Sequence, residues 1–194
     1  MLNDRQPGRF SIAVEGNISA GKTTFLNYIE NCYPDVMVLR EPMDRWTNVA
    51  GYNLFDHYLD DPERWGFHFQ TNFILTLLED MKNDCSSVKV MERSIYSAYQ
   101  IFGRYMHRIG KIHDAELDIL KRLVNVCESN PSYWIDMIIY LRDSPENCLE
   151  RMKIRDPHEM RIGYTKICHL HELLEDTFVA NTNLLPCPVY VRYL

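Results

Sequence analysis

Five short apolar runs recur along the chain, each rich in valine or isoleucine. Such runs are typical of strands that are buried on both faces of a parallel sheet. The stretches between them are long enough for the crossover helix that a parallel connection requires. The predicted strands are Phe10–Val14, Val36–Arg40, Val88–Met91, Ile135–Leu141 and Val189–Tyr193.

The segment between the second and third of these strands has a helical period. From Glu63 to Met81 apolar residues recur every fourth position, and Ile74 and Leu78 stand beside them. This pattern predicts one helix with a broad apolar face. Pro62 precedes the helix, and proline suits its first turn.

Composition and length favour one globular domain over residues 1–194, since 46% of the residues are hydrophobic and 25% are charged. We expect an α/β fold with five parallel strands flanked by helices, in which ligands bind beyond the carboxyl ends of the strands.

A net charge of −6 argues against a nucleic-acid or anionic-membrane partner. No apolar run reaches the length of a membrane span, and the start lacks the features of a signal or transit peptide, so we expect a cytoplasmic protein. The acidic run Glu172–Asp176 is interpreted as a solvated helix face.

A glycine-rich loop follows the first predicted strand and fits G-x-x-x-x-G-K-[ST] in the strand-to-helix context that this motif needs. Its backbone N–H groups can surround phosphate oxygens, and the positive end of the next helix adds to the attraction. Lys22 can reach the β- and γ-phosphates, and the Thr23 hydroxyl can bind Mg²⁺. The sequence therefore predicts a nucleoside triphosphate site, formed by Gly16, Asn17, Ile18, Ser19, Ala20, Gly21, Lys22, Thr23 and Thr24.

Charged side chains follow the second and third predicted strands, at the sheet edge where the phosphate loop also lies. A kinase that acts on an alcohol needs a base near the acceptor hydroxyl, an acidic group near Mg²⁺ and an arginine that neutralises phosphoryl charge. Glu41, Glu92 and Arg93 can fill these roles in turn.

Several motifs together resemble the deoxyribonucleoside kinase family, over a region from Ile12 to about Phe178. Besides the phosphate loop they are Glu41-Pro42 with Trp46, Asp61–Trp65, Phe69–Thr71, Glu92–Ala98, and Ile138–Arg142 with Ser144-Pro145-Glu146. The resemblance implies a P-loop kinase with a short lid, which transfers the γ-phosphoryl group of ATP to the 5′-hydroxyl of a deoxynucleoside. In its short length and lack of a leader, the chain is similar to virus-encoded members.

The resemblance also implies a role for each matching residue. Glu41 would be the general base for the 5′-hydroxyl, Arg93 would bind the 5′ oxygen, and Glu92 would lie near Mg²⁺. Gln70 would pair with the edge of the base, because its amide offers both a donor and an acceptor. The aromatic residues expected around the base are Trp46, Phe69 and Phe102; without the resemblance, all three would be interpreted as core residues.

The basic stretch from Arg151 to Arg161 resembles the family's lid. Arg151 and Arg155 fit two arginines that close over the transferred phosphoryl group. Glu159 corresponds to a lid glutamate at the sugar 3′-hydroxyl. Pro157 occupies the position of a third lid arginine, a role that Arg161 could take instead.

Two further departures from the family concern the sugar and the adenine. In the family, a tyrosine that binds the 3′-hydroxyl is expected at the position of Leu59. The neighbouring Tyr58 can replace it only if the end of the helix shifts its register by one residue, because each residue rotates a side chain by about 100° around the helix. The chain ends at Leu194, directly after the last strand, so we expect looser binding of the adenine of ATP.

Substrate choice is expected to depend on Phe73 and Ala98. One branch of the family carries a charged pair at these positions, whereas both are uncharged here, as in the branch that accepts thymidine. We therefore expect thymidine and deoxycytidine as substrates, and purines less. The resemblance also implies a homodimer, to which the apolar stretches 67–78 and 101–106 could contribute.

Two alternatives stay open. A nucleoside monophosphate kinase of the thymidylate type shares the loop and the lid, although its charged acceptor would need more basic groups than Glu41-Pro42 offers. A non-catalytic nucleotide-binding switch is the other, although the chain lacks the Asn-Lys-x-Asp guanine signature.

Overall fold

The computed structural model describes residues 9–83, 87–155 and 161–194. The chain divides into two compact units. The sheet unit comprises Phe10–Arg40, Ser86–Ser94 and Ile135–Leu194, and the helical unit comprises Glu41–Cys85 and Ile95–Trp134. Each unit is described by itself below, and the single domain expected from the sequence stays a prediction.

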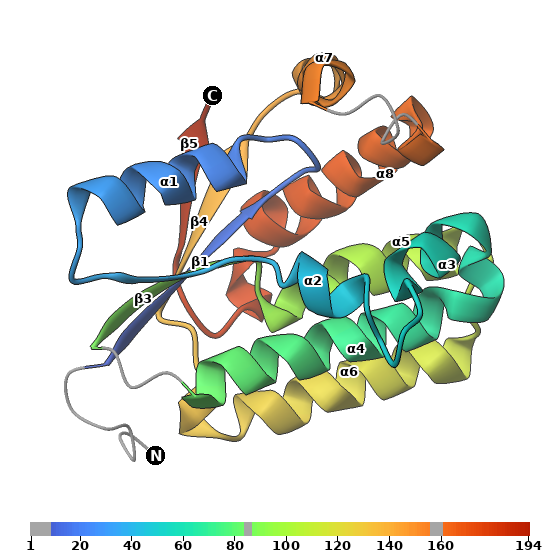
Figure 1. Ribbon diagram of the computed structural model, residues 1–194, viewed down its shortest axis with the longest axis horizontal. Helices are drawn as coiled ribbons and strands as arrows, with labels where there is room; N and C mark the ends of the chain where they lie inside the picture. Colours follow the sequence, from blue (N-terminus) through green and yellow to red (C-terminus); the bar gives the residue numbers. More distant parts are fainter. Residues whose placement is uncertain (1–8, 84–86, 156–160) are drawn as a thin grey trace. The chain divides into compact units, whose positions relative to one another are not determined.

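The sheet unit holds five parallel strands in the order β2-β3-β1-β4-β5 (Figure 1). They are β1 (Phe10–Gly16), β2 (Met37–Leu39), β3 (Val88–Glu92), β4 (Met137–Arg142) and β5 (Val189–Tyr193). All five predicted strands are confirmed to within two residues at each end, and so is the α/β class with a parallel sheet.

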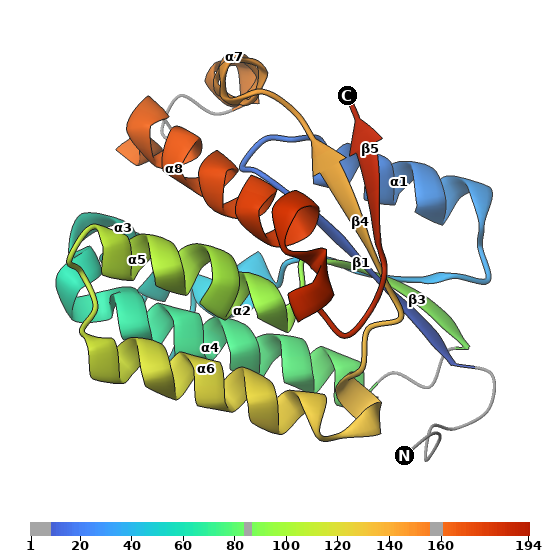
Figure 2. The same cartoon turned by 180° about the vertical axis from the view of Figure 1, so that it is seen from behind.

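Helices cover both faces of this sheet, and alternate residues of β4 show how. Ile139 and Leu141 face α1 (Lys22–Cys32), where Leu26 packs with Val14 of β1. Tyr140 points to the other face, and its ring lies 5.6 Å from that of Phe178. Phe178 belongs to the π-helix η4 (Asp176–Ala180), which continues α8 (Tyr164–Glu175). Figures 1 and 2 show α1 and α8 on opposite sides of the sheet.

The register of the sheet places the predicted phosphate loop beside the end of β3. Val14 pairs with Glu92 on one side and with Ile139 on the other, two residues before β1 ends. α7 (Pro145–Arg155) follows β4, and its buried residues Cys148 and Met152 pack on Ala20 of the loop. The loop is therefore held between a strand end and a helix of the same unit.

The helical unit is organised around α4 (Pro62–Asn83), which confirms the helix predicted from residue 63 to residue 81. Phe69, Phe73, Leu77 and Met81 are at most 5% exposed, so its apolar face is its buried face. The other helices are α2 (Met43–Trp46), α3 (Leu54–Asp60), α5 (Arg104–Arg108), α6 (Asp114–Glu128) and the 3₁₀ turn η2 (Pro131–Tyr133).

A π-helix, η1 (Ser97–Gly103), lies in the same unit and was not predicted from the sequence. A β-carbon on Gly103 would lie 2.8 Å from the carbonyl oxygen of Ala98 and 3.2 Å from Leu120 of α6. Only glycine lets the helix approach α6 this closely. Such π-helical turns are common at functional sites.

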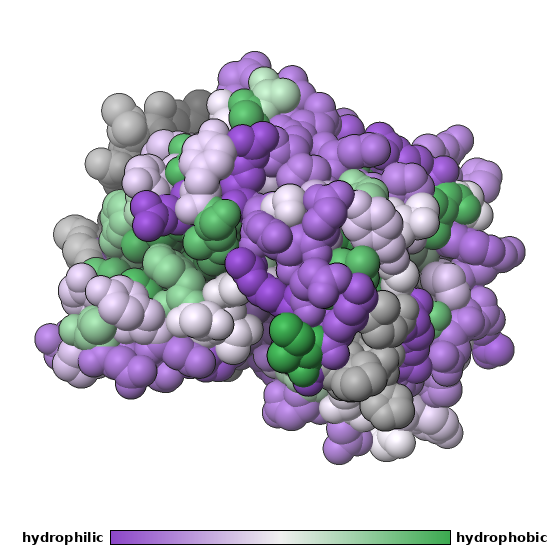
Figure 3. All heavy atoms as spheres, turned by 90° about the horizontal axis from the view of Figure 1, so that it is seen from above, coloured by the Kyte–Doolittle hydropathy of each residue, from purple (hydrophilic) through white to green (hydrophobic). Residues whose placement is uncertain are grey.

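Exposed apolar side chains are scattered among hydrophilic ones on the face that Figure 3 shows. Ile154 and Leu184 are the most exposed of the large aliphatic residues described, at 85% and 70%. Within the described ranges, no helix combines the length and the apolarity needed to cross a membrane.

The acidic run near the end of α8 is not entirely a solvated face, which corrects the sequence interpretation. Glu175 accepts hydrogen bonds from Arg142, at 2.9 and 2.6 Å, and from the Tyr140 hydroxyl at 2.8 Å. Its burial alone would raise its pKa, but the bonds from Arg142 and Tyr140 outweigh burial and lower the pKa. Glu175 thus links α8 to the end of β4.

We predict that Glu175→Gln makes the protein less sensitive to acid. The lowered pKa stabilises the native state at neutral pH, and this stabilisation is lost as pH falls from the unfolded-state value of about 4.3 through the folded-state value. The variant should be roughly 1 kcal/mol less stable than wild type at pH 7 and equally stable near pH 2.5. Urea unfolding across this range measures the difference. Glu172→Gln, on the exposed side of α8, is the control; a constant gap between wild type and Glu175→Gln would contradict the prediction.

Candidate functional site

The phosphate loop has the strand-to-helix context that the sequence predicts, and two of its positions require glycine. A β-carbon on Gly16 would lie 3.0 Å from the carbonyl oxygen of Leu141 and 3.3 Å from Ala20. Gly21 has a φ of +86°, in the left-handed region that favours glycine. The residue after it, Lys22, begins α1. The loop therefore curls tightly at the N-terminus of a helix, where anions bind well.

Asn17 fixes this loop in place. Its side-chain amide donates to the carbonyl oxygen of Ile167 in α8 at 2.9 Å, and its side-chain oxygen accepts from the N–H of Ile18 at 2.8 Å. The Nζ atom of Lys22, buried at 5% exposure, donates to the Asn17 carbonyl oxygen at 2.9 Å. Ser19 has a φ of +61°, and its buried hydroxyl lacks a partner within the described residues. The loop thus holds a cation and an unsatisfied hydroxyl where the motif predicts phosphate.

Thr23 and Glu92 lie together at the start of α1 and the end of β3. The Thr23 hydroxyl donates to Oε1 of Glu92 at 3.4 Å. Hydroxyl and carboxylate oxygens suit Mg²⁺, which keeps several waters and binds through one or two protein groups and the phosphates. The described residues contain no group of three or more His, Cys, Asp and Glu residues that could hold a metal alone. The oxygens of Thr23 and Glu92 therefore suit a Mg²⁺ ion that the phosphates of the nucleotide also coordinate.

A buried charge cluster, consisting of Glu15, Gly16, Arg93 and Ser94, joins the ends of β1 and β3. Nη1 of Arg93 donates to the Gly16 carbonyl oxygen at 2.9 Å and lies 4.0 Å from Oε2 of Glu15. The Ser94 hydroxyl donates to Oε1 of Glu15 at 2.5 Å. Arg93 has a φ of +65°, a strained value for a residue with a side chain. The cluster fixes Arg93 against the entrance to the phosphate loop.

Glu15 is the residue of this cluster that sequence reasoning missed. Its side chain is fully buried, and a buried carboxylate must be paired. One signal was available in the sequence, since Glu15 is the single charge in the run Phe10–Gly16.

The lid residues are described only in part. Arg151 lies in α7 and forms an ion pair with Asp143, which directly follows β4. Arg155 is the last residue of α7, and Arg161 is exposed. Glu159 and Pro157 lie outside the described residues.

The predicted base-binding residues of the helical unit form an aromatic cluster. The Trp46 ring lies 5.4 Å from the rings of both Phe69 and Phe73, and Tyr58 stacks on Phe69 at 4.8 Å. The Tyr58 hydroxyl donates to Sδ of Met106 at 3.8 Å. All of these residues except Met106 were predicted from the sequence to contact the nucleoside, and the structure brings them together on α2, α3 and α4.

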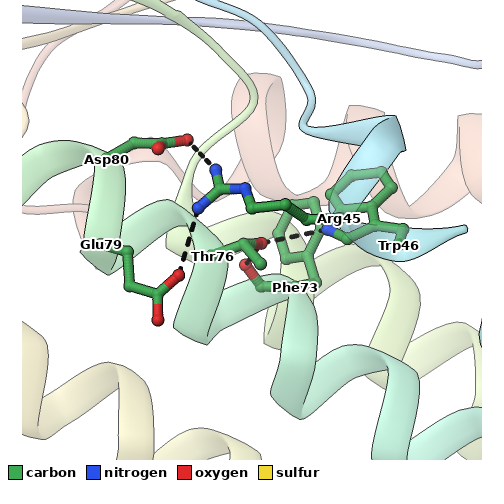
Figure 4. A network of polar contacts seen from close by, with 6 residues as sticks. All are labelled: Arg45, Trp46, Phe73, Thr76, Glu79 and Asp80. Carbon is green, nitrogen blue, oxygen red and sulfur yellow. Dashed lines mark hydrogen bonds and ion pairs between the residues drawn. The ribbon is translucent and has the colours of Figure 1, made fainter. Parts of the chain in front are cut away.

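Polar contacts fix Trp46 in this cluster (Figure 4). Its indole N–H donates to Oγ1 of Thr76 at 3.0 Å, and that hydroxyl donates to the carbonyl oxygen of Phe73 at 3.0 Å. The neighbouring Arg45 forms ion pairs with Glu79 and Asp80. α2 is thereby held on α4 by a buried aromatic contact and a more exposed ionic one.

Gln70 has an unusual environment for a polar residue. It is 1% exposed, and the described residues offer its Oε1 atom no hydrogen-bond partner. An unsatisfied buried acceptor costs about 1–3 kcal/mol, so such a group calls for an explanation. A ligand that donates a hydrogen bond would remove this cost.

The other predicted residues of the helical unit lie near its start and in η1. Glu41 is half-buried directly before Pro42 and α2. Ala98 is fully buried in η1, and Phe102 is half-buried there. The predicted donor residues and Arg93 thus lie in the sheet unit, and the other described residues predicted to contact the nucleoside lie in the helical unit. Their individual roles stay predictions.

We predict that Glu15→Ala destabilises the protein by about 3 kcal/mol, because it leaves buried polar partners unpaired. Glu15→Gln keeps the shape and should cost about half as much. Denaturant unfolding measures both values. Asp35→Ala, at an exposed carboxylate, is the control and should change stability by less than about 0.5 kcal/mol. Equal stabilities of Glu15→Ala and wild type would refute the assigned role.

A glycine-rich loop with a buried lysine, placed between the first strand and the first helix of a parallel sheet, defines an α/β P-loop kinase fold. The chain belongs to the deoxynucleoside kinase family, whose model matches residues 12–191. This confirms the resemblance drawn from the motifs.

Curated relatives agree with this assignment. The chain is 40% identical to human mitochondrial thymidine kinase 2 over 166 residues, which cover 83% of the chain and 62% of that protein. It is 36% identical to a fowlpox virus protein named a probable deoxycytidine kinase, over 81% of the chain and 68% of the relative. With mouse deoxycytidine kinase the identity is 32%, over 86% of the chain and 78% of the relative. The chain thus spans less than two thirds of the length of thymidine kinase 2.

Proposed function

We propose that this protein transfers the γ-phosphoryl group of ATP to the 5′-hydroxyl of a pyrimidine deoxynucleoside. The observation that carries the proposal is the buried, unpartnered amide oxygen of Gln70. A nucleotide-binding loop alone would suit many proteins, whereas a buried amide beside an aromatic cluster suits a planar base with polar edges. The membership of the chain in a family of deoxynucleoside kinases supports the same substrate class.

On the donor side, the phosphate loop would hold the β- and γ-phosphates of ATP. Lys22 would contribute its positive charge there, and Thr23 and Glu92 would bind Mg²⁺ together with the phosphates. When bound, Mg²⁺ would neutralise the charge that develops on the phosphates. Arg151 and Arg155 would add positive charge from α7.

On the acceptor side, Glu41 would accept the proton of the 5′-hydroxyl. A neutral hydroxyl is a poor nucleophile, and a carboxylate within hydrogen-bond reach raises its reactivity. Arg93 would bind the 5′ oxygen, and its fixed position in the buried charge cluster suits this role, because an immobile donor needs no reorganisation. Tyr58 and Glu159 would contact the 3′-hydroxyl of the sugar.

The pyrimidine preference would come from the size and charge of the base pocket. Trp46, Phe69 and Phe102 would enclose the base. The small side chain of Ala98 would leave room for the 5-methyl group of thymine, whereas the uncharged but bulkier Phe73 would narrow the pocket. Purines are larger and would fit less well. Two of the curated relatives are named for thymidine and for deoxycytidine, both pyrimidine nucleosides, which is compatible with this preference.

We also propose a homodimer that uses α4. Leu75 in the stretch 67–78 is 52% exposed, so α4 has an apolar residue available for a partner. The stretch 101–106 is less suitable than the sequence suggested, because Ile101 and Met106 are each 1% exposed.

We predict that Glu41→Gln binds nucleoside but loses turnover. The amide keeps the shape of the side chain and cannot accept the proton, so kcat should fall by about 10²–10⁴-fold while the KM for thymidine changes little. Steady-state kinetics with ATP and Mg²⁺ measure both constants. Asp44→Asn, which changes an exposed carboxylate three residues later, is the control and should retain wild-type rates. A Glu41→Gln enzyme with undiminished kcat would remove Glu41 from the chemistry.

We predict that Ala98→Asp reduces the use of thymidine more than that of deoxycytidine. The added carboxylate would occupy the space next to the 5-methyl group, so the ratio of the two kcat/KM values should shift about tenfold or more against thymidine. The ratio is the readout because partial unfolding at this buried position would lower both values alike. Equal losses for both nucleosides would contradict the pocket assignment.

A further inference from the structure

Asp143 is a buried carboxylate that the proposed chemistry does not use. It follows the last residue of β4, and its side chain is 1% exposed. Three donors converge on it, one from the residue before α7 and two from α7 itself. The N–H of Ser144 and the side-chain amide of Asn147 each donate to Oδ1 at 2.8 Å, and Arg151 pairs with Oδ2 through Nη1.

The N-terminus of α7 is capped by Ser144, whose hydroxyl accepts a hydrogen bond from the N–H of Asn147 at 3.1 Å. Asp143 lies one residue before this cap and supports it through its contacts to Ser144 and Asn147. The third contact is different, because Arg151 lies eight residues away and two turns along α7. Support of the cap needs no such partner. The ion pair therefore points to a second role for Asp143, directed at Arg151.

The pair with Asp143 uses only part of the hydrogen-bonding capacity of Arg151. Its side chain is 45% exposed, and within the described residues its polar contact is the one to Asp143 through Nη1. A guanidinium carries five N–H donors in a rigid plane. The pair with Asp143 therefore restrains the guanidinium and leaves donors that an anion can use.

Contacts of Cys148 place the pair beside the phosphate loop. Cys148 is fully buried and packs with Ala20 of the loop. The pKa of its thiol is raised to about 11, chiefly by burial and also by the charge of Asp143, while Arg151 and Lys22 act in the opposite direction. The carboxylate, the lid arginine and the loop lysine thus all lie close enough to act on one thiol.

We propose that Asp143 is a positioning residue that holds Arg151 ready for the transferred phosphoryl group. This inference rests on the proposed function. A flexible arginine side chain loses rotamer freedom when it is fixed, and a buried carboxylate that fixes it in advance removes this cost from the reaction. Asp143 stays satisfied throughout, since Ser144 and Asn147 also donate to it.

A double-mutant cycle tests this role, with Asp143→Asn, Arg151→Gln and the double variant. In the wild-type background, Asp143→Asn should lower kcat roughly tenfold or more and leave the KM for thymidine within about twofold. In the Arg151→Gln background, the same change should lower kcat by less than about twofold, because its target is gone. Equal losses in both backgrounds would overturn the inference.

Asn147→Ala is the matched control for the cap. It removes a hydrogen bond to Oδ1 of Asp143 and leaves the pair between Arg151 and Oδ2 in place. It should therefore keep kcat within about twofold of wild type. A loss as large as that of Asp143→Asn would assign Asp143 to the cap alone. Thermal unfolding is measured for every variant. If Asp143→Asn does not fold, Asp143→Ser, which keeps a capping oxygen and lacks the charge, takes its place in the cycle.

The failure of the proposed function has a different signature. If wild-type protein binds ATP and phosphorylates no nucleoside, the proposed function fails, and the cycle is then measured in the affinity for ATP by calorimetry. If Asp143 positions Arg151, the effects of the two substitutions on the ATP affinity should differ from additivity by at least about threefold. Independent effects would overturn the inference by this route as well.

Discussion

The buried charge cluster at the ends of β1 and β3 is the constraint on which the rest of the site depends. Charges in a protein interior are costly unless they are paired, and the pairing of Glu15, Arg93 and Ser94 requires the two strands to be neighbours. The same adjacency sets the loop of Gly16–Lys22 next to Glu92. A parallel sheet with this strand order therefore does more than bury apolar surface: it collects the charges that a phosphate site needs at one edge.

Within each unit, contacts to neighbouring residues hold the candidate residues in place. In the sheet unit, Asn17 attaches the loop to α8, and Asp143 holds Arg151. In the helical unit, Thr76 fixes Trp46, while Gly103 permits the π-helix that contains Ala98. Polar side chains whose positions are fixed in advance lose little freedom when a ligand binds, which favours both binding and catalysis.

Much of the fold could be predicted from the sequence, because it follows from local patterns. Apolar runs give the strands, and the four-residue period from Glu63 to Met81 gives α4. The π-helix could not be predicted, since it depends on the approach of Gly103 to Leu120 across the unit. The partners of three buried or partly buried carboxylates could not be predicted either, because they lie outside the local pattern. Glu15 pairs with Ser94, 79 residues away, Asp143 with Arg151, 8 residues away, and Glu175 with Arg142, 33 residues away. The phosphate loop could be located from the sequence, because it lies within one contiguous motif, and the binding roles of its residues stay predictions.

The choice of acceptor tests the account most directly. Purified protein would be incubated with ATP, Mg²⁺ and either thymidine, deoxycytidine, deoxyguanosine or thymidylate, and the products identified by chromatography. The account predicts 5′-monophosphates of thymidine and deoxycytidine, less product from deoxyguanosine and none from thymidylate. Phosphorylation of thymidylate alone, or ATP binding without transfer to any nucleoside, would contradict it.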